Sequence, residues 1–385
     1  MMRIVNERWA ELWTFLKPKA REFWVFVGII CEFVECQQSV ASGSQTPGRA
    51  QPANPYAPSP IVRAVSFDVA HLQRAAPGSD LWPITWSDDG DLYTSWGDGG
   101  GFGGTDTDGR VAVGIARISG PGDRWTGLNI LGGKNPVTAD APFPGKSNGI
   151  LSIGGILYLH VIEQGKWWRA KIGRSSDQGQ NWTFNEGPFD PKAWDFAEPD
   201  GAFSDMTFLN FGKDYRGARD DFVYVYSQDH RRHPDGSMAE ITDNVALFRV
   251  SKDKILEHGA YEYFAGLNPD GPTWTHDIRK RAAVFSYPEN VGFAVRVDYN
   301  PGLRRYLLTT FHRWDGSWGL YDAPEPWGPW TKASTFLQWI DSTPKFGFTF
   351  PQKWMSPDGK TMYMVFSGTG IYDSFNVVKA TVTVR

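Results

Sequence analysis

Cysteine is nearly absent from this chain of 385 residues, which contains only Cys31 and Cys36. Both precede the region of repeated strands described below, so that region has neither a disulfide framework nor a thiolate metal site. The seven histidines include no pair at the helical spacing of an HExxH zinc motif. We therefore expect no metal ligands among the site residues.

Basic clusters are also lacking. The formal net charge is −4, and no block or stripe of Lys and Arg occurs. Nucleic-acid-binding proteins usually carry such a positive surface, so we expect no nucleic acid among the partners.

No apolar run is long enough to cross a bilayer. The longest near the N-terminus covers residues 23–31, follows Lys17, Lys19 and Arg21, and ends before Glu32. A basic region, an apolar core and then small residues are typical of an export signal, although an accidental extension would look the same. We expect an export signal or extension over residues 1–36, a disordered linker over 37–60, and a secreted or periplasmic protein.

Sustained helical periodicity is absent as well, whereas short apolar strands are frequent. Aromatic residues make up 15% of the chain, with 18 Trp, 42 Gly and 26 Pro, which is typical of many strands joined by tight turns. A strand–turn–strand unit recurs five times, and its second strand ends near Asp98, Glu163, Asp229, Arg313 and Ser367. The pattern predicts an all-β, five-bladed β-propeller over residues 61–385. The strand at 61–69 is expected to close the ring by pairing with the C-terminal strand.

One local motif, Ser175-Ser176-Asp177-Gln178-Gly179-Gln180-Asn181-Trp182, matches the Asp-box S-x-D-x-G-x-x-W. Its Ser and Asp side chains are expected to bond the turn backbone, and its Gly to adopt a left-handed conformation. We predict a structural role for Asp177, on the face opposite the pocket.

Three stretches resemble a bacterial five-bladed propeller family long known as a domain of unknown function. They are residues 82–100 (WPITWSDDGDLYTSWGDGG), 319–330 (GLYDAPEPWGPW) and 375–381 (FNVVKAT), and the likeness covers about residues 80–385. The family includes endo-acting arabinofuranosidases that cut D-arabinan, and it is similar in architecture to other five-bladed glycosidases. The resemblance implies a carbohydrate-active role without fixing the substrate.

In a propeller, second strands end and first strands begin on one face, so polar residues at those positions should converge there. A glycosidase needs one protonated carboxyl group and one carboxylate. We predict Asp98, Asp205 and Glu163 as the catalytic residues, with Asp98 first because a glycine-rich loop follows it. Each also has an ordinary interpretation, as a turn cap, a hydrogen-bonded carboxyl group or a solvated loop residue.

The same reasoning predicts a set of substrate-binding residues at strand ends and loops. These are Asn148, Trp168, Asp229, His230, His312, Arg313 and Lys353. The histidines and Arg313 also allow a polysaccharide lyase, in which a His or Tyr base acts while Arg or Lys neutralises a uronate. Histidines at strand ends are, however, more often plain hydrogen-bonding side chains.

The sequence therefore favours a glycoside hydrolase that acts on a polysaccharide in a central cleft. The alternatives are a polysaccharide lyase and a non-catalytic glycan-binding propeller. We expect no cofactor, although a structural cation in the central channel is compatible with the sequence. We also expect a monomer with no membrane span in the propeller.

Overall fold

Antiparallel strands make up nearly all of the ordered structure. The computed structural model describes residues 54–134, 143, 145–162, 169–184, 196–197, 205–229, 241–370 and 373–385. Within this part the only helical segments are single 3₁₀ turns, at Val69–His71, Lys213–Tyr215, His258–Ala260, Ile278–Lys280 and Gln352–Trp354. The described residues include no helix that is long and apolar enough to cross a membrane.

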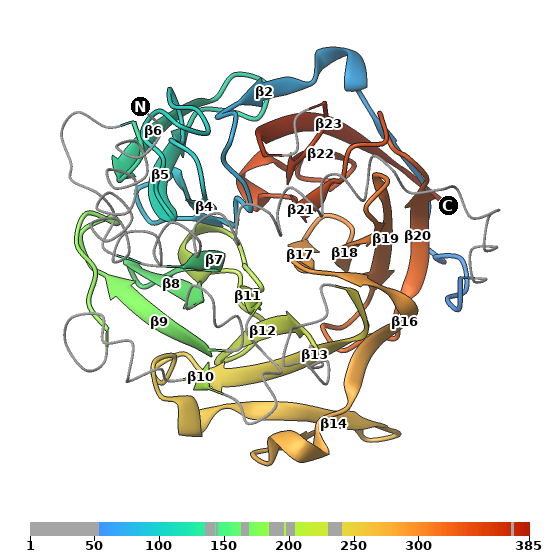
Figure 1. Cartoon of the computed structure of the whole chain (residues 1–385). Helices are drawn as coiled ribbons and strands as arrows, with labels where there is room; N and C mark the ends of the chain where they lie inside the picture. The colour runs from blue at the N-terminus through green and yellow to red at the C-terminus, as the bar shows by residue number, and fades with distance from the viewer. Residues whose placement is uncertain are drawn as a thin grey trace, which may run out of the picture. The chain divides into compact units, whose positions relative to one another are not determined.

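The described strands form five sheets that surround a common centre in a propeller arrangement (Figure 1). The first sheet contains β3 (Ile84–Trp86), β4 (Leu92–Gly97), β5 (Val113–Ser119) and β6 (Thr126–Leu131). The second contains β7 (Lys146–Ile153), β8 (Ile156–Ile162), β9 (Arg169–Ser175) and β10 (Phe196–Ala197). The third contains β11 (Thr207–Phe208), β12 (Phe222–Gln228), β13 (Ile241–Ser251), β14 (Glu262–Asn268), β15 (Gly271–Thr275) and β16 (Ala283–Gly292).

The remaining two sheets complete the ring. The fourth contains β17 (Arg296–Asn300), β18 (Arg305–Arg313), β19 (Ser317–Ala323) and β20 (Thr331–Phe336). The fifth contains β21 (Phe346–Thr349), β22 (Thr361–Ser367), β23 (Phe375–Val384), β1 (Val62–Phe67) and β2 (Gln73–Ala75). The first strand of each sheet lies nearest the centre, as Figure 1 shows for β7, β11, β17 and β21.

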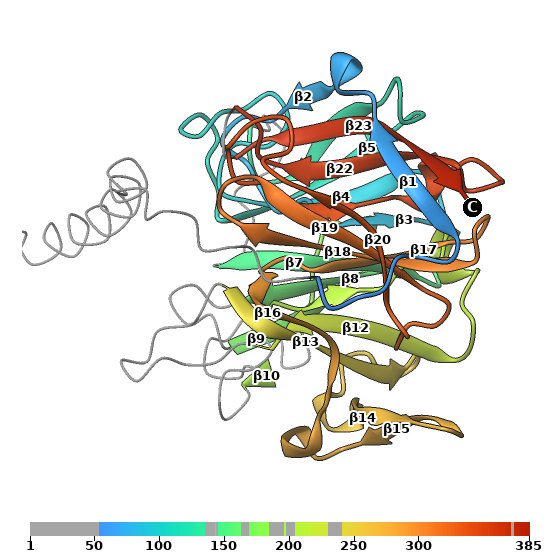
Figure 2. The same cartoon turned by 90° about the vertical axis from the view of Figure 1, so that its right-hand side faces the viewer.

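The predicted closure of the ring is confirmed. β1 pairs with β23 from Val62↔Val384 to Phe67↔Ala380, so strands from both ends of the described chain share one sheet (Figure 2). Near its end, β23 alternates buried and exposed residues, as expected for a strand with one face on the core. The pairing removes two edges that would otherwise present unpaired backbone groups.

The core lies between neighbouring sheets. Every residue of β4 is buried, and Trp82, Trp96 and Trp318 are among the largest fully buried side chains. Trp318 stacks on Phe336 and on Phe348, with ring centroids 4.4 and 4.3 Å apart, and thereby joins the fourth and fifth sheets. Large aromatic rings fill the wedge-shaped spaces that twisted, radially placed sheets leave between them.

Two sequence assignments differ from the structure. The sequence pattern predicts that the fourth repeat unit runs from Val284 to Trp330 and so begins with the β16 segment, but β16 pairs with β13 in the third sheet, and β17 is the first strand of the fourth. Residues 54–60, expected in the disordered linker, contact the sheets. Ser59 N donates to Lys332 O at 2.9 Å, and the ring of Tyr56 stacks on Phe285 at 4.7 Å. Part of the predicted linker therefore packs on the strands.

Candidate active site

We call the face on which the second strands end the upper face. Asp98 follows β4 there and Asp229 follows β12, while β11 and β17 begin on the same face, shortly after Asp205 and at Arg296. The antiparallel pairing fixes this arrangement, because the start of each first strand lies opposite the end of its second strand. In the fourth sheet, for example, Arg296 faces Thr309.

A group of charged side chains gathers on the upper face beside the first sheet. Asp80 N donates to Gly97 O at 2.9 Å and Gly97 N donates to Asp80 O at 3.0 Å, which extends the β3–β4 ladder. A Cβ atom on Gly97 would lie 2.6 Å from Asp80 Oδ1, so only glycine leaves room for this carboxyl group. The Trp-Gly-Asp sequence therefore brings Asp80 and Asp98 to the same strand end.

The two carboxyl groups have different surroundings. Asp98 forms ion pairs with Lys146 and, at 3.1 Å, with Arg110 Nη2, and its side chain is 31% exposed. Asp80 is only 8% exposed, and its Oδ1 has no hydrogen-bond partner. Burial raises the pKa of Asp80 well above its ordinary value, and the negative charges of Asp373 and Asp98 raise it further, while Lys146 opposes them. One carboxylate is thus held by cations, while burial favours the protonated form of its neighbour.

A third carboxyl group, Asp373, belongs to the same group. Asp373 O accepts a hydrogen bond from Gly78 N at 2.8 Å, which fastens it to the segment that carries Asp80. Burial and the charge of Asp98 raise the pKa of Asp373 to about 6. Like charges held this close favour keeping a proton on one of them. We call Asp80, Asp98, Asp373, Lys146 and Arg110 the acidic cluster.

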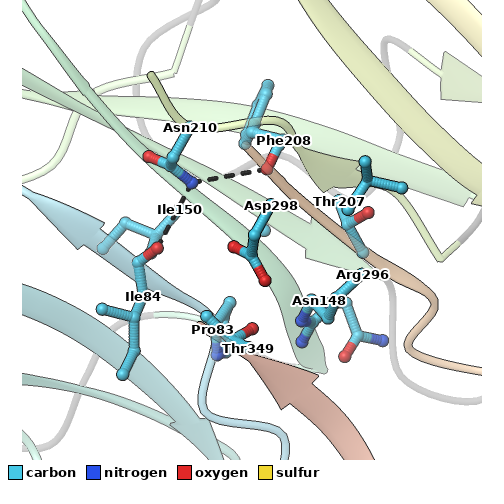
Figure 3. A pocket seen from close by; sticks show the side chains of 12 residues that line it. Pro83, Ile84, Asn148, Ile150, Thr207, Phe208, Asn210, Arg296, Asp298 and Thr349 are labelled. Carbon is cyan, nitrogen blue, oxygen red and sulfur yellow. Dashed lines mark hydrogen bonds between the residues drawn. The ribbon is translucent and has the colours of Figure 1, made fainter. Parts of the chain in front are cut away.

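Nearer the centre, a second group of polar side chains points into the channel between the first strands (Figure 3). Arg296 and Asp298 come from β17, Asn148 from β7, and all three are buried. Asp298 Oδ2 accepts from Phe350 N at 2.8 Å, and burial raises the pKa of Asp298 to about 7. Arg296 Nη2 donates to Leu81 O at 3.2 Å, which connects the channel to the residue next to Asp80.

Two more buried groups belong to this central region. Asp205 Oδ2 accepts from Ala294 N at 2.6 Å, and its charge favours the charged form of Arg296. His160 on β8 is fully buried, and burial together with the charge of Arg296 lowers its pKa to about 3. His160 is therefore neutral at any pH at which the protein is expected to work.

The predicted site residues do not form a single group. Asp98 lies in the acidic cluster, and Asp205 and Asn148 lie in the central region, with no described contact joining Asp98 to Asp205. Asp229 is paired with Arg281, whose Nη2 lies 2.9 Å from Asp229 Oδ1. Glu163, Trp168 and His230 lie outside the described residues.

Three of the other predicted binding residues lie away from the channel. His312 is buried and hydrogen-bonded, with Nε2 2.9 Å from the Tyr321 hydroxyl, and its ring stacks on Tyr287 at 4.4 Å. Arg313 is exposed at the end of β18. Lys353 comes after β21 has ended, so it lies on the lower face, where its Nζ is 3.2 Å from Asp91 Oδ1. The prediction of Lys353 as an upper-face residue is wrong, because Lys353 was taken as the start of a first strand, whereas that strand, β21, ends at Thr349.

Sequence reasoning missed several charged residues of these groups. They are Asp80, Arg110, Lys146, Arg296, Asp298 and Asp373. A usable signal existed for two of them, because Asp80 lies two residues before the start of the most specific sequence stretch and Arg296 begins an alternating strand. Among the described residues, no three His, Cys, Asp or Glu side chains form a group that could hold a metal ion.

Several solved structures are similar to this chain at low identity. The GH43_1 enzyme from Xanthomonas citri is 14% identical with a TM-score of 0.45, over 83% of this chain and 92% of that one. An endo-arabinase from Bacteroides thetaiotaomicron is 12% identical with a TM-score of 0.42, over 79% and 93%. A protein of unknown function from Dyadobacter fermentans is 13% identical with a TM-score of 0.46, over 84% and 100%. Similarity this weak says nothing about the reaction of this chain.

No curated protein matches the sequence. One family does, over residues 143–378, which is more than half of the chain. The matched segment includes β7 to β22 and the start of β23, and with them the central polar residues, whereas Asp80 and Asp98 precede it. The chain belongs to the family described as "Domain of unknown function (DUF4185)".

Proposed function

We propose that this protein hydrolyses glycosidic bonds of a polysaccharide at the acidic cluster. The observation that carries the proposal is the pair Asp80 and Asp98, two neighbouring carboxyl groups in opposite electrostatic environments. Glycoside hydrolysis requires one carboxyl group that donates a proton to the leaving oxygen and one carboxylate that acts as base or nucleophile. Environments that separate two pKa values assign those roles.

In this proposal Asp80 is the general acid, because burial and its acidic neighbours favour its protonated form. Asp98 is the base or nucleophile, since Lys146 and Arg110 stabilise its negative charge and part of its side chain reaches solvent. Lys146 contacts Asp98, and its positive charge lowers the pKa of Asp80 and of Asp373. Lys146 therefore limits the rise in pKa that burial causes at these two carboxyl groups. Asp205 is then a central residue that positions Ala294 and Arg296.

The finer structural and cellular assignments are part of the same proposal. We take each of the five sheets as one blade of a five-bladed propeller. The N-terminal basic and apolar segments favour export, and the substrate is a polymer outside the cytoplasm. D-arabinan is the first polysaccharide to test, because the sequence resembles a family that includes endo-acting arabinofuranosidases. No cofactor is needed for this chemistry, and a monomer suffices.

The test compares the wild-type chain with Asp80→Asn and Asp98→Asn on D-arabinan and on other plant and bacterial polysaccharides. We expect new reducing ends from the wild type and losses of about a hundredfold or more in each variant. Asp221→Asn is the matched control, since its side chain is 99% exposed and lies away from the cluster. All variants should keep the wild-type circular dichroism spectrum.

The competing functions give different results in the same assay. A lyase would form an unsaturated product that absorbs in the ultraviolet, and both Asn variants would remain active. A glycan-binding propeller would bind a polysaccharide in calorimetry without releasing any product. Either result would contradict the hydrolase proposal.

A further inference from the structure

The upper part of the central channel contains a small space lined by buried polar groups. Its walls come from the first strands of the five sheets and from the segment before β3, and its polar lining residues are Asn148, Thr207, Asn210, Arg296, Asp298 and Thr349. The free volume is about 10 Å³, which holds one sphere of the size of water. No sugar ring fits there, but a single hydroxyl group does.

Arg296 supplies hydrogen-bond donors that are not used. The residue is 4% exposed, and although Nη2 donates to Leu81 O, Nε and Nη1 make no hydrogen bond. Burial lowers the pKa of Arg296 to about 10, so the guanidinium still carries its charge at neutral pH. Buried donors without acceptors are rare and unfavourable, which indicates a missing partner.

Asn148 supplies an acceptor that is not used either. It is 4% exposed, and its Oδ1 has no hydrogen-bond partner, as is also true of the Thr349 hydroxyl. Asn210 lines the same channel but is fully used, because Nδ2 donates to Ile84 O and Phe208 O while Oδ1 accepts from Thr85. Figure 3 shows Arg296 and Asn148 on the opposite side of Asp298 from Asn210. Among the residues that line this space, Arg296, Asn148 and Thr349 therefore carry the unsatisfied groups, whereas Asn210 carries none.

The unused donors of Arg296 and the unused acceptor of Asn148 determine which kind of ligand can bind here. A cation would face the Arg296 charge, and a halide ion could not donate a hydrogen bond to Asn148 Oδ1. A hydroxyl group both accepts and donates, so it can satisfy Arg296 and Asn148 together. Water can do the same when no ligand is bound.

We propose that this space is a subsite for one hydroxyl group of a sugar bound on the upper face. The proposal rests on the proposed function, because it requires a saccharide beside the acidic cluster. Leu81 connects the two groups: its carbonyl accepts from Arg296, and it directly follows Asp80. Binding of the hydroxyl group would displace the channel water and fix the orientation of the sugar relative to Asp80 and Asp98. A sugar that lacks this hydroxyl would leave Arg296 and Asn148 unsatisfied and bind weakly.

The experiment measures binding separately from turnover. Asp98→Asn, which binds without hydrolysing, is titrated calorimetrically with methyl D-arabinofuranoside and with its 2-, 3- and 5-deoxy analogues. We expect one deoxy analogue to bind about 10- to 100-fold more weakly, the effect of a hydrogen bond to a charged group. Adding Arg296→Lys or Asn148→Leu should weaken binding of the parent sugar and abolish the preference for that hydroxyl.

Arg124→Lys is the matched control, because it makes the same change at an exposed arginine in the turn between β5 and β6 and should leave the preference intact. An unchanged preference in both the Arg296 and Asn148 variants would overturn the subsite while leaving hydrolysis untouched. Absence of any saccharide binding together with absence of turnover would contradict the proposed function as well. Circular dichroism shows whether each variant is folded. If either the Arg296 or the Asn148 variant fails to fold, the binding preference of the other one tests the subsite.

Discussion

At the scale of single residues, Asp80 and Asp98 show how two carboxyl groups at the same strand end can have opposite electrostatic environments. Asp98 follows a glycine into a loop and reaches two cations, whereas Asp80 lies against that same glycine and is covered. The charge on one group therefore influences the protonation of the other. A substitution that removes a single charge from the acidic cluster should therefore shift the pH profile of kcat/KM.

Asp373→Asn tests this coupling. The negative charge of Asp373 raises the pKa of Asp80, so its removal should lower that pKa. If Asp80 is the general acid, the alkaline limb of the pH profile of kcat/KM should move to lower pH, because Asp80 then loses its proton earlier. Asp221→Asn should leave the profile unchanged. A shift of the alkaline limb to higher pH would contradict the assignment of Asp80.

Asp298 should affect stability rather than catalysis. Its pKa is about 7 in the folded protein and about 3.9 when unfolded, so the folded state binds the proton more tightly. The stabilisation by the protonated group is complete below about pH 4 and is lost as the pH rises through about 7. We expect the free energy of unfolding of the wild type to fall across this range relative to Asp298→Asn. The free energies of unfolding of both proteins are measured by urea denaturation between pH 4 and 8. If both depend on pH in the same way, the predicted contribution of Asp298 is disproved.

At the scale of elements, the turn after β9 illustrates a motif whose structural role could be predicted. Ser175 Oγ donates to Asp177 Oδ1 at 2.7 Å, Asn181 N donates to the same oxygen at 2.9 Å, and Gly179 has φ +86°. These bonds are local, so the sequence alone specifies them. The turn lies at the end of β9 opposite the upper face.

Asp177→Ala should therefore change stability and not turnover. The loss of these turn hydrogen bonds should reduce the free energy of unfolding by about 1–2 kcal/mol. The activity per folded molecule should match the wild type, as measured after correction for the folded fraction by circular dichroism. Asp177→Asn retains one acceptor oxygen and should lose less. A folded but inactive alanine variant would place this residue in the site.

Non-local pairing limited the prediction of other elements. β16 and β17 both read as amphipathic strands, and nothing in their sequences reveals that β16 pairs with β13 rather than with β18. Leu81 and Trp82 have φ of +74° and +43°, so the chain bends sharply between Asp80 and β3. The alternating residue pattern of β3 does not continue across that bend, so the sequence did not predict Asp80 as a site residue. Asp98, with its local glycine signal, was predicted from the sequence, and its catalytic role stays a prediction.

At the scale of the whole molecule, the sequence predicted the all-β ring and its closure, because each repeat and each end could be recognised separately. Closure itself can be tested by truncation. A chain that begins at residue 54 retains β1, while one that begins at residue 73 lacks it and exposes the edge of β23. We expect the shorter chain to unfold at lower temperature and to aggregate, as seen by calorimetry and light scattering. Equal stability would show that β1 contributes little.

The pairing of β1 with β23 also has a consequence for how the protein is made. Arg385 Nε donates to Ser59 O at 2.7 Å, across 326 positions of the chain. On the ribosome, β1 emerges long before β23 and has no partner until β23 has been synthesised. Contacts of such long sequence separation also form slowly, since the intervening chain must be ordered first. Ring closure should therefore be the last and slowest step of folding, and chaperones would meet a chain in which β1 is still unpaired.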